Sequence, residues 1–172
     1  MKKVLLMLVI PTLSLQAMQT ARSNTLYTRG EWMHAIYSDN ITKLQELLNR
    51  GTNVNSPDHE GVTLLMVASH LDRPKTIEFL VKAGAFIDKK DNELGYTALH
   101  NAVAANSAEA VQKLTDLGAN PFIRNAAGTT PLEIAQDPDA FVIDDKARKK
   151  IVKILKEYIE KKPLDETVES AE

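Results

Sequence analysis

The sequence contains no cysteine, and this absence excludes a disulfide framework, a thiolate metal site and a lipid-modified cysteine. The stability of the chain must therefore come from packing, for which 172 residues are sufficient. A strong net charge is also missing: the whole chain carries −2, which argues against nucleic acid as a partner. These absences favour a soluble globular protein with one domain.

Motifs that support catalysis or metal binding are missing too. No Gly-rich phosphate loop, nucleophile elbow or Cys/His pair occurs. The histidines never fall at the three- or four-residue spacing that places two metal ligands on one helix face. They are His34, His59, His70 and His100. Carboxylate pairs, such as Asp88 with Asp91 and Asp144 with Asp145, are interpreted as residues of solvated loops or helix caps. We therefore predict no catalytic residue, no cofactor and no bound metal.

A long apolar run occurs only at the beginning of the chain. Lys2 and Lys3 precede apolar residues 4–15, and Gln16 and Ala17 follow them, which is the layout of a secretory signal peptide. A run of about 12 apolar residues is too short for a comfortable membrane span. We expect cleavage after Ala17 and export from a bacterial cell, to the periplasm or beyond it. Two alternatives stay open: an uncleaved helix that tethers a scaffold to the membrane, and a start site misassigned upstream of a cytosolic protein.

The chain does contain an internal repeat. One alanine column recurs at spacings of 33, 34 and 33 residues, and one glycine column at 33 and 34. The alanines are Ala35, Ala68, Ala102 and Ala135, and the glycines are Gly51, Gly84 and Gly118. A fixed period of this length indicates stacked helical hairpins.

The clearest copy runs from Gly95 to Gly118 and begins Gly-Tyr-Thr-Ala-Leu-His-Asn-Ala. A threonine stands five residues before the aligned alanine in three copies, and a glycine stands two residues earlier still. These pairs are Gly61 and Thr63, Gly95 and Thr97, and Gly128 and Thr130. The order of Thr, a small residue, Leu, His, any residue and Ala, followed by an apolar helix that ends in Gly-Ala, resembles the ankyrin repeat. The resemblance covers residues 28–160 and implies a mainly α repeat solenoid, in which helix-turn-helix units are joined by β-hairpin-like loops.

This register divides the chain into segments. Residues 1–17 are expected to be the signal peptide, 18–29 a linker, 30–161 the ankyrin repeat domain and 162–172 an acidic disordered tail. The repeats span about 28–60, 61–94, 95–127 and 128–161. The first is an atypical capping repeat, because Gly30 replaces the threonine and Trp32 replaces the leucine of the later copies. Its helices are predicted from about Glu31 to Tyr37 and from about Ile41 to Arg50, with Asn40 as N-cap.

Short helices are marginal alone, so each must bury an apolar face against its neighbours. The second helices repeat two apolar columns one turn apart. The columns are Leu44, Ile77 and Val111, and then Leu47, Leu80 and Leu114. The threonines are expected to cap the first helices, Pro131 suits position N1, and Gly51, Gly84 and Gly118 suit a turn with positive φ.

Two insertions interrupt the period. One extra residue falls at Asn92–Leu94, and about seven fall at Asp137–Ile143, between the helices of the last repeat. The last helix is predicted near Asp144 to Lys161. It directs Ile151, Ile154, Leu155 and Tyr158 to the core and Lys149, Lys150, Lys153 and Lys156 to water. With acids interleaved, this lysine stripe is interpreted as a solvated face and not as a lipid contact.

The resemblance implies a non-catalytic module that binds a protein partner on its concave face. The charge balance argues against nucleic acid, and against a membrane after signal cleavage, as partners. We expect the protein to be a monomer. His100 occupies the motif position that braces ankyrin repeats through hydrogen bonds. The predicted partner-binding residues lie on the loop tips, the exposed side of the first helices and the helix turns. They are Tyr37, His59, Glu60, Val62, His70, Leu71, Asn92, Glu93, Leu94, Tyr96 and Asn101. Tyr96 is the strongest candidate, because an exposed ring offers a large contact area, and its alternative is a ring folded over the neighbouring loop. A ligand-binding or enzymatic protein that uses the inserted segment of the last repeat is the remaining alternative.

Overall fold

The computed structural model describes residues 29–137 and 145–162. Within these residues the secondary structure is helical, with no strand, and the helices form four consecutive pairs. The pairs are a helix over residues 29–37 with α2 (Ile41–Asn49), α3 (Leu64–His70) with α4 (Pro74–Lys82), α5 (Ala98–Ala104) with α6 (Ala108–Asp116), and α7 (Pro131–Gln136) with α8 (Asp145–Lys161). The expected α repeat solenoid is confirmed.

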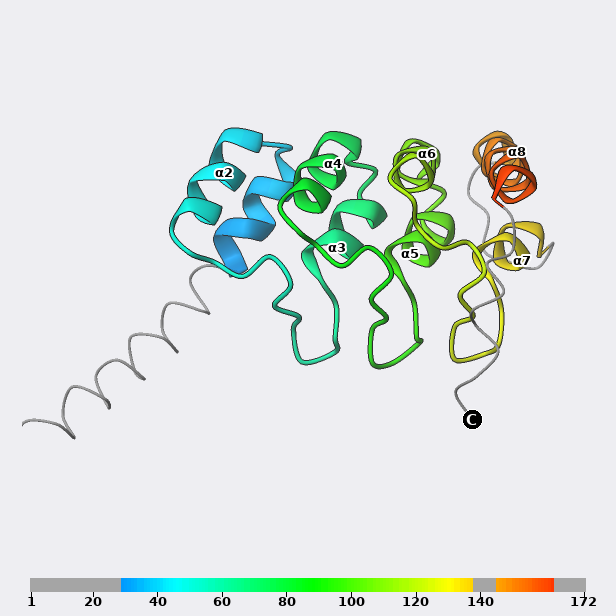
Figure 1. Ribbon diagram of the computed structural model, residues 1–172, viewed down its shortest axis with the longest axis horizontal. Helices are drawn as coiled ribbons and strands as arrows, with labels where there is room; N and C mark the ends of the chain where they lie inside the picture. The colour runs from blue at the N-terminus through cyan, green and yellow to red at the C-terminus, as the bar shows by residue number, and fades with distance from the viewer. Residues whose placement is uncertain (1–28, 138–144, 163–172) are drawn as a thin grey trace, which may run out of the picture.

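The pairs stack in two rows. Figure 1 shows α2, α4, α6 and α8 along one side and α3, α5 and α7 beneath them, with long loops projecting beyond the second row. Within a row each helix packs on the equivalent helix of the next pair: α3 on α5 and α5 on α7, α4 on α6 and α6 on α8. We call α3, α5, α7 and the helix over 29–37 the inner helices, and α2, α4, α6 and α8 the outer helices.

Threonine caps start three of the inner helices, as the sequence predicts. In each, the side-chain oxygen of the N-cap threonine accepts a hydrogen bond from the amide three residues on. The pairs are Thr63 with Met66, Thr97 with His100, and Thr130 with Glu133. Asn40 caps α2 in the same way through the Lys43 amide. These caps satisfy amides that have no partner inside the helix, so they fix where each helix begins.

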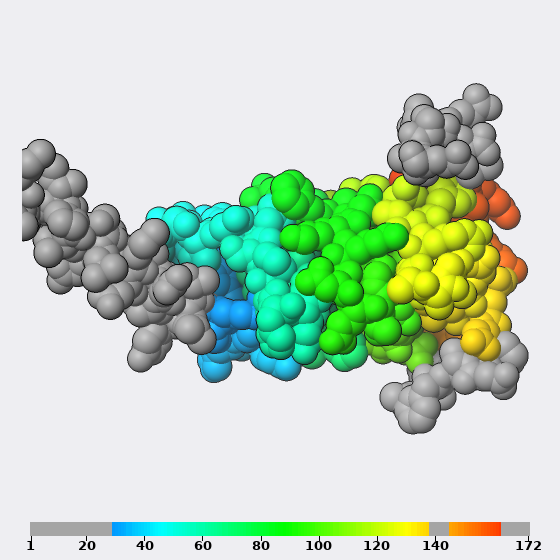
Figure 2. Space-filling model, turned by 90° about the horizontal axis from the view of Figure 1, so that it is seen from below, coloured from blue at the N-terminus to red at the C-terminus, as the bar shows by residue number. Residues whose placement is uncertain are grey.

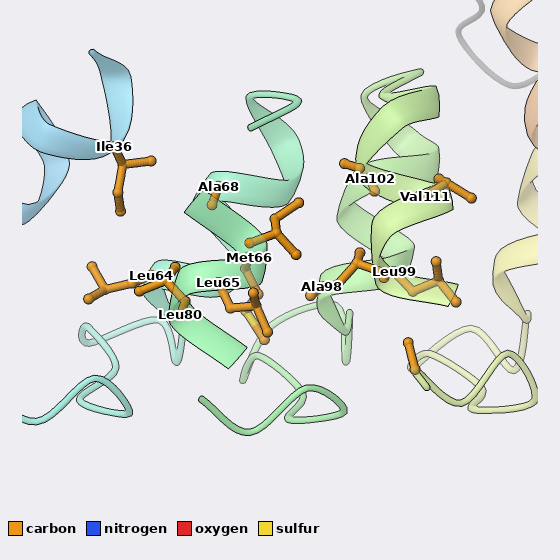
Figure 3. Packing of buried hydrophobic residues seen from close by; sticks show 14 of the residues in the cluster. Ile36, Leu64, Leu65, Met66, Ala68, Leu80, Ala98, Leu99, Ala102 and Val111 are labelled. Carbon is orange, nitrogen blue, oxygen red and sulfur yellow. The ribbon is translucent and has the colours of Figure 1, made fainter. Parts of the chain in front are cut away.

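The aligned apolar columns form one continuous core. The alanine column is buried at every copy, and Figure 3 shows Ala68 and Ala102 at corresponding places in successive repeats. The two columns of the outer helices are also buried throughout. Burial of each such leucine, isoleucine or valine is worth about 1.5–3 kcal/mol, which offsets the poor intrinsic stability of helices this short.

Both ends of the array depart from the internal pattern. Trp32 replaces the leucine of later repeats and is only 1% exposed, so the larger ring fills the core of the first repeat. At the other end, Ile151 and Leu155 of α8 are buried, and the Tyr158 hydroxyl donates to the Ala119 carbonyl at 3.0 Å. The lysines of α8 are exposed, as expected for a terminal helix.

One boundary differs from the sequence prediction. Residues 29 and 30 are already helical, so the first helix extends two residues before Glu31 and the expected linker overlaps it at Arg29. The guanidinium of Arg29 explains the extension, because it donates to Asp58 of the second repeat at 2.7 Å. The signal peptide at 1–17, the rest of the linker, residues 138–143 of the second insertion, the predicted helix start at Asp144 and tail residues 163–172 lie outside the described residues. Among the helices that the structure does describe, none is long and apolar enough to cross a membrane.

Candidate functional site

The loops between repeats end in three tight tips, at residues 58–61, 91–95 and 125–128, which we call the loop tips. An Asp or Asn begins each tip and accepts hydrogen bonds from amides further along it: Asp58 from Glu60 and Val62, for example. One backbone bond then closes each loop as a hairpin-like turn, from Asp58 to Val62, from Asp91 to Tyr96 and from Asn125 to Thr129. The middle loop spans one residue more than the other two, which confirms the insertion at Asn92–Leu94.

The tips are also bonded to one another. The Asn92 amide donates to the Glu60 carbonyl at 2.8 Å, and the Ala126 amide donates to the Leu94 carbonyl at 2.8 Å. The contact is so close that a Cβ at Gly61, where φ is +83°, would lie 2.8 Å from the Asn92 nitrogen. Figure 2 views the molecule from the side of the tips and shows successive repeats abutting. The tips therefore form a continuous ridge and not three independent fingers.

A buried histidine fixes the loop of the last repeat against the third. His100 accepts from the Thr97 amide through Nδ1 at 3.3 Å, and its Nε2 donates to the Thr129 carbonyl at 3.2 Å. Burial lowers the pKa of His100 below its ordinary value of 6.5, so the ring is neutral. The bracing role inferred from the motif is confirmed.

The same brace is absent one repeat earlier. Met66 stands at the equivalent position, where its sulfur accepts from the Thr63 amide at 3.3 Å but offers nothing to the Tyr96 carbonyl. In the first repeat Arg29 takes over, since it donates to the Val62 carbonyl at 3.3 Å as well as to Asp58. Two different side chains, Arg29 and His100, thus hold the equivalent carbonyls of Val62 and Thr129.

The loop tips and the accessible sides of the inner helices form one surface, which we call the inner face and which corresponds to the expected concave face. Few charged residues lie on its helical part. Val67 and Ile134 are half-buried, and Ala104 is exposed. Helices α3 and α5 contain no carboxylate, lysine or arginine at all. The helical wall of the inner face is therefore largely apolar and neutral.

The inner face is hollowed between the third and fourth repeats. A cavity of about 460 Å³ lies there, lined by residues of the loops, of the inner helices and of α8, among them Tyr96, Ala104, Asn106, Ala127, Ile134 and Arg148. Its volume lies within the range of about 300–1,000 Å³ that is typical of ligand pockets. Val103, Ala135 and Ile151 give it an apolar floor, while Asn106 and Arg148 are polar.

The connection between inner and outer helix is longer in the repeat that borders the cavity. It takes residues 71–73 and 105–107 in two internal repeats, whereas α7 ends at Gln136 and α8 begins at Asp145. In the short turns Asp39 and Asp72 have positive φ and reach the next repeat, where they accept from Thr76 and from the Ala110 amide, each at 2.7 Å. Asn106 has the same backbone conformation, with φ 56°. Among the described residues its side chain has no such contact to α8.

The predicted partner-binding residues fall into two groups. His59, Glu60, Asn92, Glu93 and Leu94 are exposed on the loop tips. Tyr37 and His70 are exposed near the helix turns, with half-buried Leu71 beside them. The turns are tied together too, because the Tyr37 carbonyl accepts from Arg73 and the His70 carbonyl accepts from Ser107. The structure brings each group together along the array and separates the two groups by the inner helices.

Three predicted residues, Val62, Tyr96 and Asn101, are half-buried. Asn101 donates to the Thr97 carbonyl at 3.1 Å, so its amide also stabilises α5. The prediction of an exposed Tyr96 ring is wrong: the ring stacks on buried His100, with 5.4 Å between ring centroids. It packs over the brace beneath it, because the residue lies between Gly95 and Thr97, the N-cap of the helix that carries His100. One part of the ring still lines the cavity.

Sequence reasoning missed the cavity residues Ala104, Ile134 and Arg148. A signal was present, since Asn106 aligns with Asp39 and Asp72 while the insertion at Asp137–Ile143 displaces its partner. It also missed Phe86, which is 64% exposed in the connection after α4 and which no sequence pattern distinguishes from a core residue.

The electrostatics of the site do not favour acid–base chemistry. The pKa of Glu133 is lowered, first by the Thr130 amide and then by the Thr130 hydroxyl, so this cavity carboxylate is ionised and serves as a cap. A general acid needs the opposite shift. Glu78, which bridges Lys82 and Lys113 on neighbouring outer helices, has a pKa of about 2. Within the described part of the chain, no group of three His, Cys, Asp or Glu residues is placed to hold a metal ion.

Comparison with known proteins identifies the repeat. A family model described as ankyrin repeats, in three copies, matches residues 32–125. The chain is 38% identical over 94 residues to palmitoyltransferase Hip14 of Drosophila melanogaster, covering 55% of this chain and 15% of the relative. It is 35% identical over 121 residues to human SH3 and multiple ankyrin repeat domains protein 2, covering 69% and 6%. It is 34% identical over 134 residues to BRCA1-associated RING domain protein 1 of Caenorhabditis elegans, covering 77% and 18%. The chain thus spans less than a fifth of the length of each of these relatives.

Proposed function

The chain belongs to the ankyrin repeat family, and from that premise we propose that it binds a protein partner on its inner face and catalyses no reaction itself. Ankyrin repeats are protein–protein interaction modules. The observation that supports binding on this face is its apolar, neutral helical wall, which ends in the cavity between the third and fourth repeats. A surface that combines accessible apolar residues with a hollow is typical of a binding site.

The geometry also favours a preorganised surface. The ridge of loop tips is held by backbone bonds between neighbouring tips and by the braces at Arg29 and His100. A partner that binds such a surface loses little free energy to ordering the protein, which raises affinity for a given contact area.

The test uses crosslinked capture with the tagged full chain from its source cells. Ala104→Arg places a bulky charge at the mouth of the cavity from an exposed position. Gln112→Arg is the matched control, since Gln112 is exposed on outer helix α6. We expect Ala104→Arg to lose the captured protein and Gln112→Arg to keep it. The reverse result would place the interaction on the outer helices and refute the proposal.

We also propose that the protein acts outside the cytoplasm of a bacterial cell. This proposal rests on residues 1–17, in which two lysines, an apolar run and Ala17 follow the order of a cleaved signal. N-terminal sequencing of the secreted or periplasmic product should begin at Met18. A membrane-bound product that starts at Met1 would favour a tethered scaffold instead.

A further inference from the structure

Charge is distributed unequally between the two sides of the array. Of the inner helices, α3, α5 and α7 contain no lysine or arginine, and neither do the loop tips, whereas the helix over 29–37 contains Arg29. Every outer helix contains lysine, and α8 together with Lys162 has eight basic residues against three acidic ones. The inner face is therefore neutral to acidic although the chain as a whole is nearly neutral.

The acidic part of the inner face lies on two tips. Asp58 and Glu60 belong to the tip of the second repeat, and Asp91 and Glu93 to the tip of the third. The Glu60 carbonyl accepts from the Asn92 amide at 2.8 Å, so the two tips are adjacent. Four carboxylates in adjacent tips, without a lysine or arginine among them, create a negative potential that favours a cationic partner.

One of the four carboxylates is paired with a basic side chain of the protein. Arg29 pairs with Asp58 at 2.7 Å, and His59 Nε2 lies 3.3 Å from Glu60. Asp91 uses its Oδ1 to accept from the Glu93 and Leu94 amides, which leaves its charge in place. No ion pair to Glu93 is formed by the residues that the structure describes. Lys89 and Lys90 directly precede Asp91 in the chain, and Arg124, which pairs with Glu133, also donates to the Gly128 carbonyl of the last tip at 2.6 Å.

The opposite end of the inner face is apolar. Ala104 and Ile134 lead into the cavity, and Ile151 contributes to its floor. Charged side chains of both signs line it as well, since Glu133 and Asp137 stand there beside Arg148, which donates to Asp145. This end can therefore bury an uncharged side chain of a partner.

We propose that the inner face binds an extended segment of the partner protein that carries aliphatic side chains beside basic ones. The aliphatic side chains enter the cavity between the third and fourth repeats, and the arginines or lysines lie against the tips of the second and third. The proposal rests on the proposed function, because it assigns a chemical class to the partner of the same face. It excludes an acidic segment, which the four tip carboxylates repel.

The first experiment needs no knowledge of the natural partner. A phage-displayed library of random peptides is selected on the immobilised full chain. We expect the recovered peptides to be enriched in Lys or Arg together with Leu, Ile or Val, relative to the starting library. Recovery of acidic peptides, or of no peptide, would overturn the inference.

The second experiment locates the binding of one recovered peptide by fluorescence polarisation. The double variant Glu60→Lys/Glu93→Lys reverses two exposed side chains of the tips. Glu157→Lys/Glu160→Lys makes the same change on exposed positions of α8 and is the matched control. We expect the tip variant to weaken binding about tenfold at physiological ionic strength, as two partly screened charge contacts are lost, and the control to leave it unchanged. Thermal unfolding followed by circular dichroism checks that each variant is folded.

A third variant separates the two proposals. If Ala104→Arg abolishes peptide binding while the tip variant does not affect it, the inner face is the binding site and the charge inference is wrong. If neither Ala104→Arg nor the tip variant weakens binding, the proposed inner face itself is wrong, and the charge inference is refuted with it.

Discussion

Replacement of His100 by methionine tests the brace that holds the fourth-repeat loop. The chain itself supplies the design, because Met66 occupies the equivalent position and keeps the contact to its N-cap amide at 3.3 Å. In His100→Met the methionine sulfur should therefore accept from the Thr97 amide in place of Nδ1, and the hydrogen bond from Nε2 to the Thr129 carbonyl is lost. The variant removes one interaction and preserves the capping geometry.

The expected cost follows from what remains at each end of the lost bond. The Thr129 carbonyl keeps the bond from the Asn125 amide at 2.9 Å, so it is not left unsatisfied. The stacked Tyr96 ring, 5.4 Å from the imidazole, gains a sulfur contact in exchange for the ring contact. We therefore expect a loss of about 1 kcal/mol in the free energy of unfolding, the usual net value of one hydrogen bond. The reverse change, Met66→His, should gain a similar amount if its Nε2 reaches the Tyr96 carbonyl.

The same variant should change the dependence of stability on pH. Burial lowers the pKa of His100 in the folded protein, so the unfolded chain binds a proton more readily. The stability that this histidine contributes is complete above its ordinary pKa of 6.5 and declines as the pH falls below it. Methionine does not titrate, so His100→Met should lose this part of the decline.

Urea unfolding followed by circular dichroism at pH 7.5 and pH 5.5 measures both effects. The parent, His100→Met and Met66→His form the set, and equal denaturant slopes would show that the change lies in stability alone. If His100→Met equals the parent in stability and in the difference between the two pH values, the brace is not a stabilising interaction. The neutral, buried histidine would then have no energetic consequence, contrary to the reasoning above.

Three further predictions concern packing, backbone and charge. Leu99→Ala should destabilise by about 2–5 kcal/mol, because the side chain is fully buried in the shared core, and an unchanged thermal midpoint would contradict the register. Gly61→Ala should lower the free energy of unfolding more than Gly84→Ala. Both glycines have positive φ, but of the two only Gly61 would bring its added Cβ against backbone, 2.8 Å from the Asn92 nitrogen. Equal losses of stability in urea unfolding would disprove the close contact. Ion pairs lower the pKa of Glu78 from 4.5 to about 2, so the parent should lose their contribution to stability as the pH falls through this range. Glu78→Gln should lack this part of the acid dependence, and identical acid-unfolding curves for the two proteins would refute the ion pairs.

The repeat architecture was predictable because the same residue types recur at a fixed interval along the sequence. Thr97 and Leu99 stand at positions that a helix start and a core contact require, and the same order recurs in other copies, whereas the brace of His100 does not. Each copy faces the same neighbours, so one pattern determines both local helix and inter-repeat packing. The columns of buried residues, the caps and the glycine turns were therefore confirmed.

The surface was less predictable, because exposure depends on what lies across from a residue. Tyr96 was expected to be an exposed ring, yet it stacks on His100. Arg29 was assigned to a linker, yet it belongs to the first helix and donates to Asp58 and Val62 in the loop that follows the first repeat. In both cases a contact with another side chain or with a distant loop decides the position of the residue. The spacing of residues in the sequence does not show in which direction a side chain points.

The sequence by itself determined the number of helical pairs, their caps and their core, since these depend on short-range order repeated at a fixed period. Only the tertiary structure decided that the tips join into a ridge through the Asn92 and Ala126 amides, and that a cavity lies beside Asn106 between the third and fourth repeats. Backbone hydrogen bonds between loops do not require particular side chains, so no sequence motif marks them. A cavity depends on the distance between surfaces whose residues are far apart in the sequence. The inner face that we propose as the binding site is therefore a property of the stacked array and of no single repeat.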